Sequence, residues 1–370
     1  MTKFSFKNIF THFKIKGKSI KDIDCDEELI FPEETFQMPA IKDILGFDHE
    51  CFGDFNSNIP SFYVRSVKNG ICRTNKEEVY INEGEVIEEF TSQEANPRIG
   101  KLKLNKNKIK YVKGKVAYLS LAGLENNYYH WLIECLGRLY LVERSKFKPD
   151  YYILSQNMPF KKEYVKLLGI DENKIIPAES NQIIQADELI VPDFINNWDF
   201  IDFRGYQHYQ KQYLPSWIGN LYKERILPNV QEFAPKRLYI SRAKANYRRI
   251  LNEDELIDVL KKYNFEIIYP EDIGIIEQIN LFHNAEIIIS PMGAGLGNIV
   301  FAKPGTKVLE LCPEYFHTSC LRILAHVMKL SYHYFVGKTA DTSMHPQQED
   351  FCINAQNFEE ALKNKVFKKE

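Results

Sequence analysis

The chain has 370 residues, of which 44% are hydrophobic and 26% charged, and its 48 Lys and Arg nearly balance its 50 Asp and Glu. This length predicts two domains rather than one core, and the near-neutral charge excludes the basic surface typical of nucleic-acid-binding domains. The seven cysteines are scattered without a C-x-x-C pair, which indicates reduced thiols rather than a disulfide framework or a zinc site.

Residues 1–21 form a basic, aromatic N-terminal segment. It holds six lysines and no acid, with Phe or Ile at positions 4, 6, 9, 10, 13 and 15. This composition suits binding to an anionic membrane surface, and the alternative is a tail that packs its aromatic side chains on its own domain. No secretory signal pattern and no apolar run of about 18 residues is present, so we expect a cytoplasmic protein. Peripheral attachment at the inner membrane face is an open alternative.

Residues 22–225 are expected to form a first α/β domain. Short alternating patterns at 78–81 and 116–119 predict strands, and a long helical pattern runs from Tyr128 to Arg144. Residues 151–195 then alternate strand, helix and strand, which favours a parallel sheet. Residues 196–235 are polar and aromatic with three prolines, and we interpret them as the connection between two halves.

Residues 226–340 alternate strand and helix more regularly. The first predicted helix starts with Asn252 as its cap. Such a series predicts an α/β domain of the nucleotide-binding type, whose ligands lie beyond the carboxyl ends of the strands, where the strand order reverses. We expect the tail at 341–370 to pack back on the first domain. The predicted strands are 237–242, 265–270, 286–290, 307–313 and 331–337.

A glycine loop, SPMGAGLGN at 290–298, directly follows the three isoleucines 287–289 of a predicted strand. Gly293, Gly295 and Gly297 are spaced G-x-G-x-G, which differs from the dinucleotide pattern G-x-G-x-x-G and lacks the lysine of a P-loop. A strand, a bare turn and a helix N-terminus together favour an anion. The alternative is that the glycines serve tight packing.

Two further features carry candidate chemistry. Arg242 ends the first strand of the second domain, and Arg248 and Arg249 follow in its loop, where they could clamp a diphosphate or simply lie exposed. His130, Glu134 and Arg138 recur at i, i+4 and i+8, so one helix face would present a base and its orienting carboxylate. The alternative is a charge ladder with His130 packed under Trp131, and two ligands without a third make a poor metal site.

The blocks YYHWLIECLGRL, RLYISR with NEDEL after it, and EQINLFHNAEIIISPMGAGLGNIVFAKPGTKVLELCP resemble those of family 61 glycosyltransferases. The resemblance covers residues 115 to 315. It implies an α/β fold of the GT-B type, two Rossmann-like domains facing across a cleft. It also implies an inverting transfer from a nucleotide-sugar held by the C-terminal domain, with no required metal and no cofactor.

Carried onto matching positions, the resemblance places Arg242 at the donor diphosphate, the glycine loop against the donor and Glu310 near the ribose or sugar. The expected donor residues are Arg242, Arg248, Pro270, Met292, Gly293, Ala294, Gly295, Asn298 and Glu310, and the expected acceptor-side residues are Asn127 and Arg138. Two positions depart from the family pattern. Met292 stands where members commonly have His, and Gly137-Arg138 where many have Pro-Arg.

We therefore expect a metal-independent, inverting glycosyltransferase that extends a bacterial surface polysaccharide, such as a capsule or lipopolysaccharide chain. His130 or Glu134 would be the base, with Arg242 and Arg248 as cations. The expected partners are a nucleotide-sugar and a glycan or lipid-linked glycan, with an anionic membrane surface and a homo-oligomer left open, and no nucleic acid. The alternatives are a catalytically inactive relative acting as a binding subunit, and an enzyme that transfers another group onto a glycan.

Overall fold

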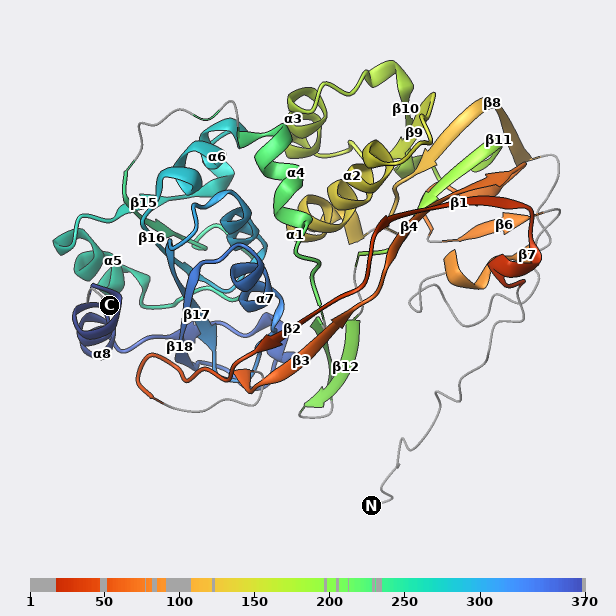
Figure 1. The fold of residues 1–370 in the computed structure, drawn as a ribbon. Coiled ribbons are helices and arrows are strands. Elements are labelled where there is room, and N and C mark those ends of the chain that lie inside the picture. Colours follow the sequence, from red (N-terminus) through yellow and green to blue (C-terminus); the bar gives the residue numbers. More distant parts are fainter. Residues whose placement is uncertain are drawn as a thin grey trace.

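The computed structural model describes residues 18–46, 52–76, 78–81, 85–90, 108–121, 124–195, 198–203, 206–211, 213–227, 230 and 235–367, with the backbone alone for 198–203 and 206–211. The N-terminal segment predicted at 1–21 lies outside these residues up to position 17. Among the described helices, none has the length and apolar character needed to span a bilayer. The chain forms two sheet-containing halves with helices between them (Figure 1).

The first half is built on a mixed sheet with nine strands in the described residues. Its main order is β10-β9-β8-β11-β5-β6-β7, and β4 joins β11 to β1. Only the β8–β9, β9–β10 and β8–β11 pairs are parallel. The strands are β1 Cys25–Phe31, β4 Phe62–Lys68, β5 Ile71–Arg73, β6 Val79–Ile81, β7 Glu85–Val86, β8 Ile109–Tyr118, β9 Tyr151–Leu154, β10 Ile175–Pro177 and β11 Ile183–Pro192.

The second half is a doubly wound sheet in the order β15-β14-β16-β17-β18-β19, parallel except at the β18–β19 pair. The predicted alternation of strand and helix is present here, whereas the first half is only partly parallel. Nucleotide binding by this half stays a prediction. The strands are β14 Arg237–Ile240, β15 Glu266–Ile268, β16 Ile287–Pro291, β17 Lys307–Pro313, β18 Ser331–Thr339 and β19 Phe351–Cys352. The helices are α5 Glu253–Lys262, α6 Ile275–Asn284, the 3-10 helix η11 Ala294–Phe301, α7 Cys320–Val327, α8 Ala355–Ala361 and the π-helical η13 Leu362–Val366.

The helix predicted from Tyr128 to Arg144 is present but interrupted. It consists of α1 (Tyr128–His130), a π-helical turn η6 (Trp131–Cys135) and α2 (Leu136–Arg144). A π turn contains one residue more than an α turn. The side chains after it therefore point in a different direction than they would on an uninterrupted α-helix. The hydroxyl of Tyr222, on α4 (Ile218–Arg225), donates to the carbonyl of Leu132 inside this turn.

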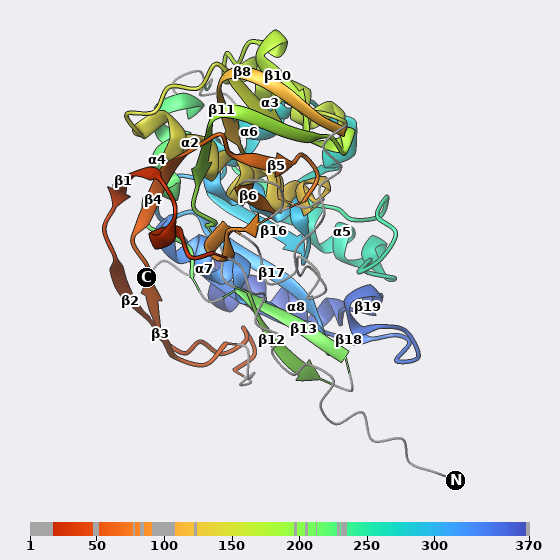
Figure 2. The same cartoon turned by 90° about the vertical axis from the view of Figure 1, so that its right-hand side faces the viewer.

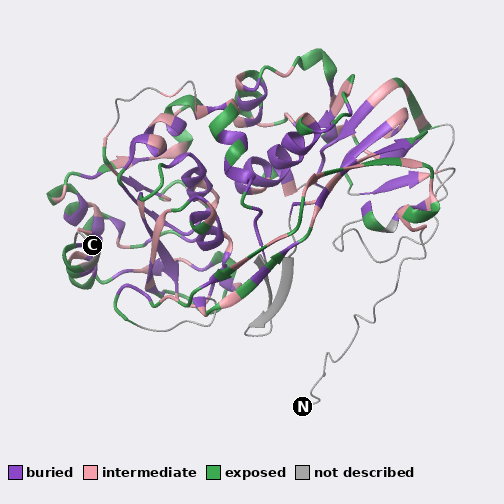
Figure 3. Ribbon diagram, in the orientation of Figure 1, coloured by how far each residue is buried: buried purple, intermediate pink, exposed green. Residues whose placement is uncertain are grey.

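The connection predicted at 196–235 contains regular structure. Strands β12 (Trp198–Phe203) and β13 (Tyr206–Lys211) pair as a hairpin, and α4 follows them. Helices α1, α2 and α4 lie between the two sheets, and α2 is largely buried (Figure 3). One hydrophobic cluster runs from the first half through these helices to the inner side of the second sheet. A cleft between the halves stays a prediction.

A second hairpin joins the halves along one side of the molecule (Figures 1 and 2). It consists of β2 (Glu34–Met38) and β3 (Phe55–Ile59). On the second half, the buried Arg322 of α7 donates to the carbonyl of Gly53 over 2.9 Å and to that of Pro39. The hairpin is therefore an arm of the first half that is hydrogen-bonded to the second.

Two features at the ends of elements differ in detail from the expectation. Asn252 stands at the N-cap of α5 as predicted, but its side chain makes no capping hydrogen bond. Its amide instead exchanges two hydrogen bonds with the backbone of Ile353, at 2.8 and 3.1 Å. In the C-terminal tail, Phe351, Phe358 and Leu362 join the hydrophobic cluster of the second sheet, which also contains Ile44 of the first half.

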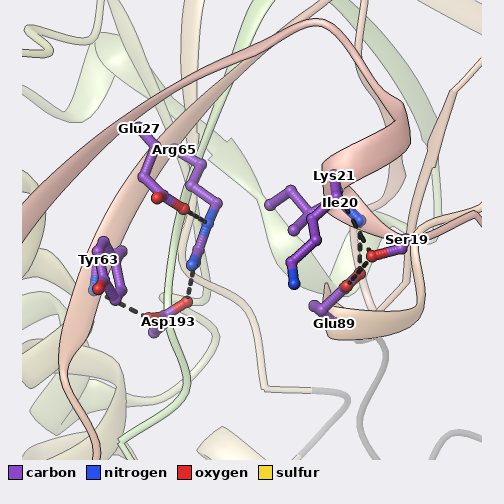
Figure 4. Close-up of polar contacts among 8 residues, drawn as sticks. All are labelled: Ser19, Ile20, Lys21, Glu27, Tyr63, Arg65, Glu89 and Asp193. Atoms are coloured by element: carbon purple, nitrogen blue, oxygen red, sulfur yellow. Dashed lines mark hydrogen bonds and ion pairs between the residues drawn. The ribbon is translucent and has the colours of Figure 1, made fainter.

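Polar contacts hold the start of the described chain to the first sheet (Figure 4). Glu89 accepts hydrogen bonds from the Ser19 hydroxyl at 2.7 Å and from the Ile20 N–H at 2.9 Å. Nearby, Arg65 lies between two carboxylates, those of Glu27 at 2.6 Å and Asp193. The described chain therefore begins at this edge of the first half.

Candidate active site

The candidate site lies where the second sheet reverses its strand order. The chain adds β15 on one side of β14 and then returns to add β16 on the other, so the loops after β14 and β16 are neighbours. Ligands of doubly wound sheets bind beyond the carboxyl ends of the strands at this point. Arg242 follows β14 and Gly293 follows β16, and the predicted diphosphate residues are therefore brought together.

Gly293 and Arg242 are in direct contact. A Cβ atom built on Gly293 would lie 2.0 Å from Nη1 of Arg242, which is much closer than two such atoms can approach. The backbone of Gly293 is extended, so its conformation does not require glycine. The missing side chain is what lets the guanidinium lie against the loop.

The guanidinium of Arg242 has few hydrogen-bond partners for its charge. Nη2 donates to the carbonyl of Tyr247 at 3.0 Å, and Nε has no hydrogen-bond partner among the described residues. Burial lowers the pKa of Arg242 below its usual value, because desolvation disfavours the charged form. The side chain still carries a positive charge at neutral pH.

Arg248 places a second guanidinium beside the first. Its Nε donates to the carbonyl of Met292 at 3.2 Å, and Nη1 donates to that of Gln347 at 2.9 Å. Burial, and then the charge of Arg242, lower the pKa of Arg248 to about 10. The backbone of Arg248 has φ 55°, a left-handed conformation that is unusual for a residue with a side chain. In the described part of the chain, neither Arg242 nor Arg248 forms an ion pair with a carboxylate.

Glu310 adds a buried carboxyl group from the next strand, β17. It is 1% exposed and lies opposite Ser290 of β16 in the sheet register. The Tyr332 hydroxyl donates to its Oε2, while Oε1 has no partner within the described residues. Burial raises the pKa of Glu310 to about 7, against the opposing effects of Tyr332 and Arg248. Such an unpartnered oxygen could accept a hydrogen bond from a ligand hydroxyl.

The other residues expected at the donor site lie on or beside the glycine loop. Met292 is buried and pairs its N–H with the Leu311 carbonyl at 2.9 Å. A Cβ on Gly295 would meet only Pro270 Cγ, at 3.9 Å, so Pro270 lies beside the loop. Asn298 is fully buried and donates to Gln278 at 2.8 Å while it accepts from the Tyr128 hydroxyl. Asn298 therefore links the glycine loop to α1, and its contact with a donor stays a prediction, as does that of Ala294.

His130 and Glu134 form the expected pair. Nδ1 of His130 lies 2.9 Å from Oε1 of Glu134, and the histidine side chain is 18% exposed against 5% for the glutamate. Helix α1 packs on η11, where a Cβ on Gly297 would lie 3.2 Å from the ring of Tyr129. The pair is thus carried by a helix that touches the glycine-loop helix.

The two expected acceptor-side residues have structural partners. Asn127 caps α1 by accepting from the Tyr129 N–H at 2.9 Å. Arg138 is fully buried and donates to the carbonyls of Ser120 and Pro192, at 2.6 and 3.2 Å. The π turn separates Arg138 from the exposed side of His130, and an acceptor contact of either residue stays a prediction.

Tyr247 and Tyr332 belong to the site and were not predicted. Tyr247 directly precedes Arg248 in the sequence, and this position could have identified it as a candidate site residue. Tyr332 reaches Glu310 only through the alignment of β17 and β18, and no local pattern reveals that contact.

Comparison with known proteins identifies a family. Residues 128–309 match the family model described as Glycosyltransferase 61. The chain is 34% identical over 92 residues to the EGF domain-specific O-linked N-acetylglucosamine transferase of Mus musculus, covering 22% of this chain and 18% of that protein. It is 31% identical over 99 residues to the protein of that name from Drosophila melanogaster. That match covers 25% of this chain and 18% of the Drosophila protein. The matches thus span less than a fifth of these relatives. The chain belongs to family 61 of the glycosyltransferases.

Proposed function

We propose that this chain transfers a sugar, with inversion, from a nucleotide-sugar donor whose diphosphate binds between the loops after β14 and β16. The observation that carries the proposal is a pair of neighbouring guanidinium groups, the partly buried Arg242 against the bare backbone of Gly293 and the buried Arg248 at the Met292 carbonyl. Neither has a carboxylate partner among the described residues. A dianionic diphosphate would supply the missing counter-charge, and bidentate arginine bonds suit its oxygens.

In the proposed reaction, an acceptor hydroxyl oxygen attacks the anomeric carbon as the bond to the diphosphate oxygen breaks. Glu134 accepts a hydrogen bond from protonated Nδ1 of His130, which leaves Nε2 free of a proton and able to take the one from the acceptor hydroxyl. Arg242 and Arg248 stabilise the negative charge that develops on the departing diphosphate. A single displacement of this kind inverts the anomeric centre.

Independence from metal ions is part of the proposal, because the two arginines already provide two positive charges where the leaving group would lie. We expect turnover to persist in EDTA. Loss of turnover on chelation and its return with manganese would contradict this part of the proposal and leave the donor site unaffected.

For the acceptor, we propose a growing bacterial surface polysaccharide or a related glycan, following the family resemblance in the sequence. The name shared by the animal relatives supports N-acetylglucosamine as the first donor sugar to test. A screen of nucleotide-sugars against glycan and peptide acceptors separates these possibilities. Transfer to a folded peptide domain alone would contradict the polysaccharide proposal.

A second candidate is a catalytically inactive binding subunit, and Met292 is the observation that favours it. Its buried thioether stands where the family commonly has a histidine and cannot carry a proton. Nucleotide binding without turnover on any acceptor would support this candidate.

The decisive experiment measures nucleoside diphosphate binding by isothermal titration with two arginine variants. Arg242→Ala removes charge-assisted hydrogen bonds worth about 1.5–3 kcal/mol and should weaken binding about 10- to 100-fold. Arg237→Ala is the matched control, because Arg237 starts the same strand at its opposite end and donates to the Tyr263 carbonyl. Equal affinity of Arg242→Ala and the wild type would place the diphosphate elsewhere.

A further inference from the structure

Tyr247 is an exposed aromatic residue next to the buried Arg248. Its relative exposure is 38%, whereas that of Arg248 is 9%. Other residues of this loop, such as Lys244 and Arg249, are exposed as well. Its carbonyl accepts from Arg242, and its ring lies 4.9 Å from the guanidinium carbon of Arg248. The residue therefore touches both cations of the proposed diphosphate site and still presents ring surface to solvent.

The position of this ring is fixed by the loop beneath it. Arg248, on which the ring rests, is anchored to the carbonyls of Met292 and Gln347. The left-handed backbone of Arg248 sets the turn directly after Tyr247. A ring held in this way loses little conformational freedom when a ligand binds to it, which favours affinity.

We propose that Tyr247 is the stacking platform for the nucleobase of the donor. This inference rests on the proposed function, because it takes the diphosphate to lie at Arg242 and Arg248. A nucleobase is the planar, apolar-faced part of a nucleotide-sugar, and stacking on an aromatic side chain contributes about 1–3 kcal/mol per base. The phosphates would be held by the arginines, and the base by the ring next to them.

Pyrophosphate and nucleoside diphosphates separate the two contributions. Binding of inorganic pyrophosphate, uridine diphosphate and guanosine diphosphate would be measured by isothermal titration on the full chain. Tyr247→Ala should weaken binding of both nucleotides about 5- to 100-fold and leave pyrophosphate binding within about twofold. Tyr247→Phe keeps the ring and should bind like the wild type. Tyr111→Ala is the matched control, because Tyr111 is an exposed tyrosine of β8 in the first half.

Other results would contradict either the stacking role of Tyr247 or the proposed function. If Tyr247→Ala weakens pyrophosphate and nucleotides equally, the ring only supports Arg248 and the inference fails. If Tyr247→Ala binds the nucleoside diphosphates like the wild type, the ring does not stack on the base and the inference fails. Failure of the wild type to bind either pyrophosphate or nucleotide would overturn the proposed function itself.

Discussion

The glycines of the loop after β16 differ in what their missing side chains allow. At Gly293 the space is filled by the guanidinium of Arg242, whereas at Gly295 the nearest atom beyond the chain neighbours is Pro270 Cγ at 3.9 Å. The sequence shows the G-x-G-x-G spacing, but it does not show which glycine is sterically required. That distinction depends on a side chain about 50 residues earlier, brought close by the pairing of β14 with β16.

We therefore expect Gly293→Ala to weaken nucleoside diphosphate binding about 10-fold or more, because the new methyl group must displace Arg242. Gly295→Ala should bind like the wild type, since its methyl group meets only an ordinary van der Waals contact. Isothermal titration on both variants, with circular dichroism as the folding control, tests the pair. Equal effects of the two substitutions would show that the contact with Arg242 is unimportant.

The buried Glu310 carboxyl predicts a pH dependence of stability. Its pKa is about 7 in the folded chain, against an ordinary value of 4.5 for a glutamate. Between about pH 4.5 and 7, the Glu310 carboxyl has lost its proton in the unfolded chain but keeps it in the folded chain. The free energy of unfolding therefore falls as the pH rises from about 4.5 to 7. The change attributable to this group is roughly 3 kcal/mol.

The measurement compares urea unfolding of the wild type and Glu310→Gln at pH 5 and pH 8. The amide does not titrate, so the stability of the wild type relative to Glu310→Gln should be lower at pH 8 than at pH 5. A difference that stays constant with pH would mean that Glu310 is ionised throughout. Bound nucleotide should reverse part of the effect if its hydroxyl donates to Oε1.

At the scale of elements, the C-terminal tail holds the loop that carries the site arginines. Asp350 accepts from the Arg249 N–H at 2.8 Å and from its guanidinium at 2.7 and 3.1 Å. Phe351 pairs with the backbone on both sides of Ile250, and Gln347 accepts from Arg248. The tail therefore fixes the backbone conformation in which Arg248 faces the glycine loop.

We expect Asp350→Ala to weaken nucleoside diphosphate binding by about threefold or more, because the loop loses its carboxylate partner. A charge swap, Asp350→Arg with Arg249→Asp, should recover part of that affinity. The control is Glu359→Ala, which removes ion pairs of α8 with Lys262 and Lys363 that do not involve this loop. An Asp350→Ala variant with unchanged affinity would show that the loop keeps its shape without the tail.

The elements that the sequence predicts well are those determined by local pattern. The strands at 237–242 and 307–313 and the helix from Tyr128 follow from hydrophobic periodicity, and their positions are confirmed. The π turn is not predictable in this way, because its freed Leu132 carbonyl is satisfied by Tyr222, 90 residues later. Asn252 stands at the predicted N-cap of α5 but makes no side-chain capping bond for a similar reason, since its amide binds Ile353, 101 residues away.

At the scale of the whole molecule, the two halves share one interior. Leu132 of the first half and Ile299 and Leu324 of the second belong to a single hydrophobic cluster. Glu163 of α3 (Pro159–Leu167) accepts from the Ile275 N–H at 2.8 Å and so caps α6 across the boundary. Sequence patterns identify each half but not the apolar face between them, because either half could bury such a face against its own helices.

This shared interior predicts that the second half does not fold alone. A fragment of residues 226–370 keeps the whole parallel sheet but exposes the sides of α6, η11 and α7 that pack in the shared cluster. Burial of apolar surface contributes about 25 cal/mol per Å², so losing this interface removes a large part of the stability of a fragment of that size. We expect the fragment to aggregate or to unfold without a sharp transition, while the full chain unfolds in one calorimetric transition whose van't Hoff and calorimetric enthalpies agree. Size-exclusion chromatography and calorimetry of both proteins test this, with co-expression of residues 1–225 as the control that should restore a soluble complex. A monomeric fragment with its own cooperative transition would show that the second half is an independent domain. The apolar interface would then only join two halves that are each stable alone.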